Sequence, residues 1–177
     1  VHIAVEGGLP PLVELLSSPF LDCQHYAARC IYRLAANNEN HRRMRMEGAL
    51  PPLIRMLSVD SEPCQRCAAM SLCNLVTDID NCAAVPVLDG LFPLINLMDH
   101  ESLPCRRYAV MAVCNLAAMR DNQVTILGAG VLPPLLRLIE SFDIDCKRYG
   151  GMALCNLSSH ERNRRTIVLG NALGPLV

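Results

Sequence analysis

The chain repeats itself every 41 residues, and this period constrains the fold more than any other feature of the sequence. A leucine recurs at that step, each time directly after a proline, and no insertion or deletion interrupts the register. Two cysteine columns and an asparagine column keep the same step, with a tyrosine as first member of the second cysteine column. The columns are Leu12, Leu53, Leu94, Leu135 and Leu176; Cys23, Cys64, Cys105 and Cys146; Tyr32, Cys73, Cys114 and Cys155; and Asn40, Asn81, Asn122 and Asn163. Such a period is typical of stacked repeat units.

Each copy contains three segments with helical character. Segment 49–58, ALPPLIRMLS, places its apolar residues on one helical face, with prolines in the first turn, where backbone N–H groups have no partner. Segment 61–77 predicts a longer helix, and segment 39–48 predicts a shorter helix that ends on a glycine suited to a C-cap. Since no segment alternates with period two like a strand, the sequence predicts an all-α solenoid with three helices per 41-residue repeat.

The repeat also shows where one copy departs from the others. Ser61 is expected to be the N-cap of its long helix, and Ser102 and Asp143 take that position in the next two copies. Pro86 lies inside a short helix and is expected to shorten it. Gly150-Gly151 replaces an alanine pair inside a long helix, at a cost of about 2 kcal/mol. Close packing is the favoured reason for this pair, with a functional bend as the alternative.

The whole chain is expected to be one repeat array and a fragment of a longer protein. Its two ends resemble the interior of an array, and solenoids need polar capping repeats, so neighbouring subunits are an alternative cover for the ends. The copies are predicted at about residues 8–48, 49–89, 90–130 and 131–171, followed by the start of a fifth.

Composition narrows the classes of function. The chain is 51% hydrophobic and 19% charged, which is enough to bury a core, and its aromatic residues are four Tyr and three Phe, with no Trp. The net charge is −1, so the overall charge points to no class of partner. No apolar run reaches about 18 residues, so the sequence predicts no membrane-spanning helix. Because so few aromatic residues are available for base stacking, we expect no nucleic acid. We also expect no direct membrane contact, since no apolar run is long enough to span a bilayer.

The ten cysteines are interpreted as reduced, buried thiols. Column-mates lie on equivalent helices about 8–10 Å apart, whereas a disulfide needs Cα atoms within about 7 Å. Cys64 and Cys67 form a CxxC pair, but no second pair or nearby histidine completes a four-ligand zinc site. The histidines pair with no cysteine or serine at a spacing typical of a catalytic site, and the sequence contains no phosphate-binding glycine loop. We therefore expect no metal, no cofactor and no enzymatic activity, and an intracellular, cytoplasmic protein, with nucleus and cilium as alternatives.

The copies resemble the armadillo repeat. The resemblance rests on EGALPPLIRMLS, followed by a polar turn and by CQRCAAMSLCNL, and it covers nearly the whole chain. HEAT repeats are the nearest alternative, but they usually lack a separate short helix and this asparagine column. The resemblance implies a right-handed α-α superhelix whose long helices line a concave, peptide-binding groove. It is nearest to scaffold proteins built of armadillo repeats alone, vacuolar or ciliary, with a groove more like that of the catenins than that of the importin-alpha adaptors.

By this resemblance, Asn74, Asn115 and Asn156 line the groove, and Arg33 takes their position in the first copy. An amide side chain offers both a donor and an acceptor, as an extended peptide backbone does. A row of amides can therefore hold a peptide without reading its sequence. The alternative is that these amides only bond neighbouring helix ends. The other asparagine column begins the short helix and is expected to cap or turn the chain.

Two further columns on the same helical face complete the predicted groove. One lies four residues before the asparagine column, where nuclear-import adaptors of the family carry tryptophans. Its methionines are expected to form a soft apolar floor, with burial in the core as the alternative. The other column lies one turn further back and is mostly arginine. The members are Arg29, Met70, Met111 and Met152, and then His25, Arg66, Arg107 and Arg148.

Basic residues dominate the predicted long helices. Seven Lys and Arg side chains, and no Asp or Glu, fall within residues 23–36, 64–77, 105–118 and 146–159. Acidic residues collect in the turns before these helices, where the helix macrodipole favours them. We therefore expect a protein-interaction scaffold whose groove binds an extended, acidic segment of a partner protein. The alternatives are a nuclear-transport adaptor with a degenerate groove, which prefers basic peptides, and a purely structural stacking module, which binds neither.

Overall fold

The computed structural model describes residues 7–169, which form twelve α-helices and two 3-10 turns. In each copy a helix of seven to nine residues precedes a long helix and then a short one. The first kind comprises α2 (Leu9–Leu15), α5 (Leu50–Met56), α8 (Leu91–Leu97) and α11 (Leu132–Glu140). The long helices are α3 (Leu21–Leu34), α6 (Glu62–Leu75), α9 (Leu103–Ala118) and α12 (Ile144–Ser158). The short helices are α4 (His41–Met46), α7 (Ile79–Val87), α10 (Gln123–Gly128) and α13 (Glu161–Leu169).

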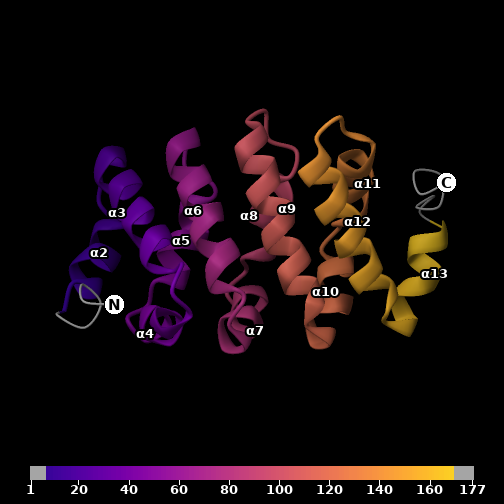
Figure 1. The fold of residues 1–177 in the computed structure, drawn as a ribbon, viewed down its shortest axis with the longest axis horizontal. Coiled ribbons are helices and arrows are strands. Elements are labelled where there is room, and N and C mark those ends of the chain that lie inside the picture. The colour runs from indigo at the N-terminus through magenta and orange to yellow at the C-terminus, as the bar shows by residue number, and fades with distance from the viewer. Residues whose placement is uncertain (1–6, 170–177) are drawn as a thin grey trace.

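The long helices lie side by side in chain order, from indigo at one end of the molecule to orange near the other (Figure 1). Each long helix packs against the long helix of the next copy and against the preceding helix of its own copy. The short helices α4, α7 and α10 gather along one edge (Figure 1). The predicted all-α solenoid with three helices per repeat is confirmed. The start of the predicted fifth copy, residues 172–177, lies outside the described residues.

Within residues 7–169 no single helix is long and apolar enough to cross a membrane. Only the bent pair formed by residues 120–128 and 132–140, at 93° to each other, has the required length and composition.

Small and aliphatic side chains fill the space between the helices, because the sequence has so few aromatic residues. The interior members of the leucine column and of the first cysteine column are 0% exposed: Leu53, Leu94, Leu135, Cys64, Cys105 and Cys146. The cysteines of this column therefore pack as small apolar residues.

The buried asparagine column ties the end of each long helix to the short helix that follows. Each Nδ2 donates to the carbonyl six residues earlier, in the last turn of the long helix. The four bonds join Asn40 to Leu34 (2.8 Å), Asn81 to Leu75 (3.0 Å), Asn122 to Leu116 (3.3 Å) and Asn163 to Leu157 (3.0 Å). Each of these carbonyls also accepts the backbone N–H of the residue three positions later, so the amide adds a second donor at the C-terminus of the long helix. The column is thus a turn residue, as predicted.

Ser61 and Ser102 stand at the N-cap position, but neither side chain accepts a capping hydrogen bond. The Ser102 hydroxyl donates instead to Glu62 Oε1 of the preceding copy, at 2.8 Å. The prediction that Ser61 and Ser102 cap their helices through the side chain is therefore wrong. For Ser102 the reason is that a carboxylate lies within reach of the hydroxyl. Asp143 does cap its helix, since its Oδ1 accepts from the Cys146 N–H at 2.9 Å.

Pro86 does not shorten its helix, contrary to the prediction. The helix α7 runs for nine residues, whereas α4 and α10 have six each. A proline leaves the carbonyl four residues earlier without its helical donor. Here that carbonyl belongs to Cys82, and Nδ2 of Asn122 in the next copy donates to it at 3.0 Å. The lost hydrogen bond is replaced from the neighbouring copy, and Pro86 lies only one residue before the helix end.

The predicted glycine after the short helix is confirmed. Gly48 and Gly130 have φ of +77° and +85°, in the left-handed region that glycine adopts without strain. Asp89 occupies this position in the copy between them, at φ +57°.

The two glycines of the pair in α12 have different surroundings. A Cβ at Gly150 would lie 3.2 Å from Ile139 Cγ1 of α11, whereas a Cβ at Gly151 would meet no atom within 4 Å. The helix continues through both residues. Close packing therefore explains Gly150, and nothing in the structure explains Gly151.

We expect Gly151→Ala to raise the free energy of unfolding by about 1 kcal/mol, because alanine loses less backbone entropy than glycine in a helix. Gly150→Ala should gain less or lose stability, because Ile139 must move. Urea denaturation followed by circular dichroism compares the two variants with the wild type. Equal gains at both positions would contradict the packing role of Gly150.

Candidate functional site

Two equivalent pockets lie between long helices, on the side that carries the predicted groove residues. The first pocket, about 390 Å³, lies between α3 and α6 and is lined by His25, Arg29, Tyr32, Arg33, Arg66, Cys67 and Met70. The second pocket, about 400 Å³, lies between α9 and α12 and is lined by Pro104, Arg107, Tyr108, Met111, Asp145, Arg148 and Tyr149. We call this surface of the four long helices the groove face.

The structure brings most of the predicted arginines and methionines together on the groove face. They contribute Arg29, Arg33, Arg66 and Met70 to the first pocket, and Arg107, Met111 and Arg148 to the second. Met70 and Met111 are half-buried, and Met152 is 49% exposed. Met70 and Met111 therefore border the pockets, Met152 lines neither of them, and none of the three is enclosed in the core. The role of the methionine column as a floor for a ligand stays a prediction.

The groove asparagines form a row of hydrogen bonds between consecutive long helices. Each Nδ2 donates to the carbonyl 42 residues earlier: Asn74 to Tyr32 (3.4 Å), Asn115 to Cys73 (3.2 Å) and Asn156 to Cys114 (3.3 Å). The alternative role considered for these asparagines, a hydrogen bond to a neighbouring helix, is therefore present in the structure. Each side chain is still half-buried rather than enclosed, and its Oδ1 accepts no hydrogen bond from any residue within 7–169.

Tyrosines on the groove face are the residues that the sequence analysis missed. Tyr32 lines the first pocket, and Tyr108 and Tyr149 line the second. The Arg148 guanidinium carbon lies 4.8 Å from the centre of the Tyr149 ring, a cation–π distance. Burial raises the pKa of the Tyr108 phenol, and the nearby Tyr32 phenol adds to the shift. The sequence does contain a pattern that could have identified them, because all four tyrosines of the chain fall on the long helices.

The long helices do contain acidic residues, which corrects the predicted charge pattern. The helices begin earlier than expected, so Asp22, Glu62 and Asp145 lie in their first turns. Glu62 Oε1 accepts from Arg66 at 3.0 Å, and Arg148 donates to Asp145 at 2.9 Å. Two groove arginines therefore carry a carboxylate partner from their own helix.

Arg107 is held by carboxylates of the next copy. Its Nε donates to both carboxylate oxygens of Asp143 at 3.0 Å, and it lies 3.8 Å from Asp145 Oδ2. The hydrogen bond from Arg107, helped by the N–H of Cys146, holds the pKa of the Asp143 carboxyl well below its usual range. The pair joins α9 to the start of α12, so it contributes to stacking as well as to the charge of the second pocket.

The first pocket keeps positive charge that the second pocket lacks. Arg29 and Arg33 are exposed, and neither forms an ion pair with another residue of the described part of the chain. Of the three guanidiniums that line the first pocket, Arg66 alone is paired with a carboxylate of the described residues, that of Glu62. Around the second pocket two guanidiniums face two carboxylates. The positive surplus of the groove face therefore lies over α3 and α6.

All ten cysteines are free thiols. Burial raises the pKa of Cys73 to about 12, and that of Cys82 and Cys146 to about 11, so these groups stay protonated at neutral pH. A protonated, buried thiol is a poor nucleophile and a poor metal ligand. Between residues 7 and 169 no three His, Cys, Asp or Glu side chains are placed to hold a metal ion.

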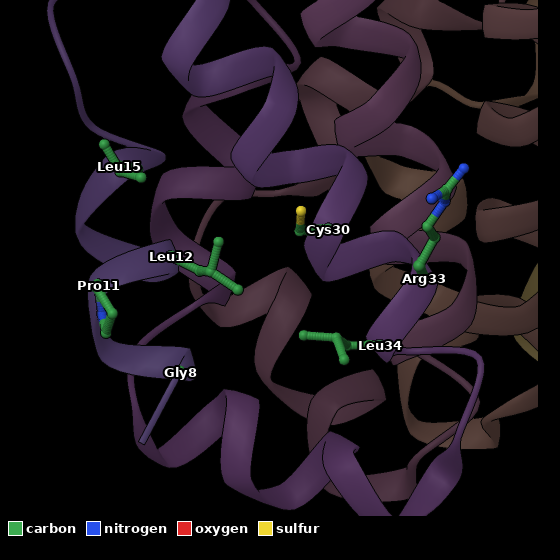
Figure 2. Close-up of a pocket in the computed structure, with 7 residues that line it drawn as sticks. All are labelled: Gly8, Pro11, Leu12, Leu15, Cys30, Arg33 and Leu34. Carbon is green, nitrogen blue, oxygen red and sulfur yellow. The ribbon is translucent and has the colours of Figure 1, made fainter. Parts of the chain in front are cut away.

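A more apolar pocket of about 460 Å³ lies at the N-terminal end of the described array (Figure 2). Leu12, Leu34 and Cys30 lie around it, while the Arg33 side chain extends away (Figure 2). In the next copy, the residues equivalent to Leu12, Leu34 and Cys30 are buried against the preceding copy. They are Leu53, Leu75 and Ser71. This pocket is therefore a stacking surface of the repeat, not a ligand site.

Comparison with known proteins gives the following similarities. The armadillo/beta-catenin-like repeat family matches residues 1–36. A computationally designed armadillo repeat protein for modular peptide recognition superimposes with a TM-score of 0.92 and 27% identity, over 96% of this chain and 73% of that chain. A designed armadillo repeat protein in complex with the peptide (KR)4 superimposes with a TM-score of 0.93 and 26% identity, over 99% and 75%. No curated protein matches the chain in sequence.

We expect Asp143→Asn to lower the stability at neutral pH, by an amount that shrinks progressively once the pH falls below about 4. A carboxyl whose pKa is lowered by folding stabilises the fold above its ordinary pKa of about 4, and this contribution is lost as the pH falls below that value. Asparagine can still cap the helix but cannot form the ion pair with Arg107. The difference between the two melting temperatures should therefore be constant from about pH 7 to about pH 5 and should become smaller only below about pH 4.

Asp99→Asn is the matched control, because Asp99 pairs with Arg137 across two copies but both side chains are about half exposed. An exposed pair contributes little, so this variant should shift the melting temperature only slightly. A gap between Asp143→Asn and the wild type that stays constant with pH would contradict the ion-pair argument.

Proposed function

The chain belongs to the armadillo-repeat family, and on this premise we propose that its groove face binds an extended segment of a partner protein. The chain would then act as an interaction scaffold, with the segment running across α3, α6, α9 and α12. The observation that carries the proposal is the row of groove asparagines. Each offers a half-buried amide oxygen without a donor in the described part of the chain, at the spacing of the repeat.

The bond that each amide makes inside the array favours this use. Because Nδ2 is held by a carbonyl of the preceding helix, the amide is oriented before a ligand arrives, and a preorganised site loses less entropy on binding. Adjacent long helices are about 8–10 Å apart, and an extended chain advances about 3.4 Å per residue. Successive amide oxygens would therefore meet backbone N–H groups about two to three residues apart.

Two designed relatives support a peptide as the class of ligand. One is described as made for modular peptide recognition, and the other was solved in complex with (KR)4. The second ligand is basic, so the charge that this chain prefers has to be argued from its own groove face.

We propose that the partner segment is acidic where it crosses α3 and α6. The surplus of guanidinium groups there comes from Arg29, Arg33 and Arg66, of which Arg66 alone forms an ion pair within residues 7–169, with Glu62. A guanidinium binds both oxygens of a carboxylate in its planar fork, which suits aspartate and glutamate side chains. Over α9 and α12 the charges are balanced, so that half of the groove face sets no demand on the charge of the segment.

Two other functions compete with this proposal. A nuclear-transport adaptor would prefer a basic peptide, and the (KR)4 complex of the designed relative supports that alternative. A structural stacking module would bind no peptide, and the hydrogen bonds of the groove asparagines to neighbouring helices support it. The ten free thiols are consistent with a reducing, intracellular compartment, which we also propose.

We expect an acidic extended peptide to bind more tightly than a basic peptide of equal length, and to weaken as salt is raised. The double variant Arg29→Glu and Arg33→Glu should weaken acidic-peptide binding at least about tenfold, because two attractive contacts become repulsive. Fluorescence anisotropy at low and high salt measures both effects. Arg55→Glu is the control, since this exposed arginine of α5 lines neither groove pocket. Tighter binding of the basic peptide would overturn the acidic preference and favour the adaptor.

We expect Asn115→Ala to weaken peptide binding about tenfold, the effect of losing one hydrogen bond of about 1.4 kcal/mol. Stability should also fall, because the Cys73 carbonyl loses its donor. Asn122→Ala is the control: it removes a buried amide of similar structural role and should lower the melting temperature without changing the affinity of the folded protein. If Asn115→Ala lowers only the melting temperature, the amide row is structural.

A further inference from the structure

A pocket of about 360 Å³ lies directly beside Asn115, where two copies meet. One wall comes from the α6–α7 turn and α7, and the other from the end of α9. Its lining is mainly apolar and includes Val76, Ile79, Cys82, Ala118 and Met119. Because Asn115 belongs to the amide row and also lines this pocket, the pocket is continuous with the groove face. We call it the register pocket.

Two side chains of the register pocket are apolar where the repeat is otherwise polar. At the position of Ile79, which is 71% exposed, the other copies carry Asn38, Arg120 and Glu161. At the position of Met119, the other copies carry Asn37, Asp78 and His160. The two exceptions come from different copies, yet they line the same pocket. The repeat itself therefore does not require apolar residues here.

Met119 replaces a residue that caps the short helix in the other copies. Asn37, Asp78 and His160 each accept a hydrogen bond from a backbone N–H two or three residues later. Met119 stands at the same place before the turn Arg120–Asn122 and makes no side-chain cap. Losing a cap lowers stability, and an exposed isoleucine gains nothing from burial. Positions that break a local rule without a gain in stability are expected at functional sites.

We propose that the register pocket receives one aliphatic side chain, Leu, Ile or Met, of the bound segment. The inference rests on the proposed function, since it needs a peptide on the groove face. A backbone bonded to Asn115 presents a neighbouring side chain at the pocket, because successive side chains of an extended chain point to opposite sides. The occupant is aliphatic because the wall is made mainly of branched and thioether side chains, and none of the lining residues is Asp, Glu, Lys or Arg.

This pocket supplies what the amide row lacks. Equivalent amides at a constant spacing hold a backbone equally well after a shift by one copy, so they do not set the register of the peptide. A single apolar pocket at one junction does set it. The preferred segment then combines acidic residues over α3 and α6 with one aliphatic residue at the junction of α7 and α9.

The test compares two peptides of about twelve residues made of Asp, Ser and Gly, one with a central Leu and one with Ser in its place. The Leu peptide should bind the wild-type chain about tenfold more tightly, from burial of one aliphatic side chain. Ile79→Asn and Met119→Asn, which restore the residue types of the first copy, should bring both peptides to the same affinity. Met119→Asn should at the same time raise the melting temperature, because it restores a cap, so lost discrimination cannot come from unfolding.

Val124→Asn, on α10 and outside the register pocket, is the control and should leave the preference for Leu unchanged. Equal binding of the Leu and Ser peptides to the wild type overturns the register pocket and leaves the proposed function standing. Absence of binding by either peptide overturns both. Leu preference that persists in the two pocket variants places the apolar contact elsewhere and also overturns the proposal.

Discussion

The hydrogen bond from a side-chain amide to a carbonyl of the preceding copy is the interaction on which the array depends. A helix pair cannot bury its apolar surface alone, so each copy is stable only against its neighbours. Packing of leucine, alanine and cysteine supplies the free energy, but such small, similar side chains could slide past one another. The bonds of Asn74, Asn115 and Asn156 to a carbonyl 42 residues earlier fix the stagger between long helices. The same amides then face the groove at that stagger.

Departures from the repeat are compensated by residues of a neighbouring copy rather than locally. The carbonyl that Pro86 leaves without a helical donor is bonded by Asn122, and the Ser102 hydroxyl is bonded by Glu62. Compensation of this kind is available because consecutive long helices pack against each other, and α7 and α10 each contact the long helix of the next copy. Met119 is different, since no neighbour supplies the missing cap within the described part of the chain. An uncompensated departure carries more information about function than a compensated one.

The sequence alone was sufficient for the helices, their order and the residues that share the groove face, because the 41-residue period constrains all of them at once. It was not sufficient for the partners of polar groups. Asp143 lies 36 residues from Arg107, and the distance between them depends on the rise and twist of the superhelix, which no local pattern encodes. The helix starts were predicted about two residues late, which hid Glu62 and Asp145 from the count of charges. The tyrosines of the pockets were missed although Tyr108 and Tyr149 share one column with Tyr26, whose fourth member is Cys67, while Tyr32 heads a cysteine column.

The charge of the groove face depends on pairs of copies, and the residue that precedes each long helix contributes to it. Arg107 is bonded by Asp143, the residue that stands just before the long helix of the next copy, and this carboxylate neutralises the charge of Arg107 at the second pocket. One copy earlier the same position is Ser102, so Arg66 receives no carboxylate from its neighbour and depends on Glu62 of its own helix. A change between serine and aspartate in the turn before a long helix therefore switches the charge of the pocket formed with the preceding copy. It follows that counting the charged residues of whole helices gives a wrong estimate of the net charge of the groove face. Under the proposed function, a segment that is acidic along one half and uncharged along the other therefore suits this array better than a uniformly charged one.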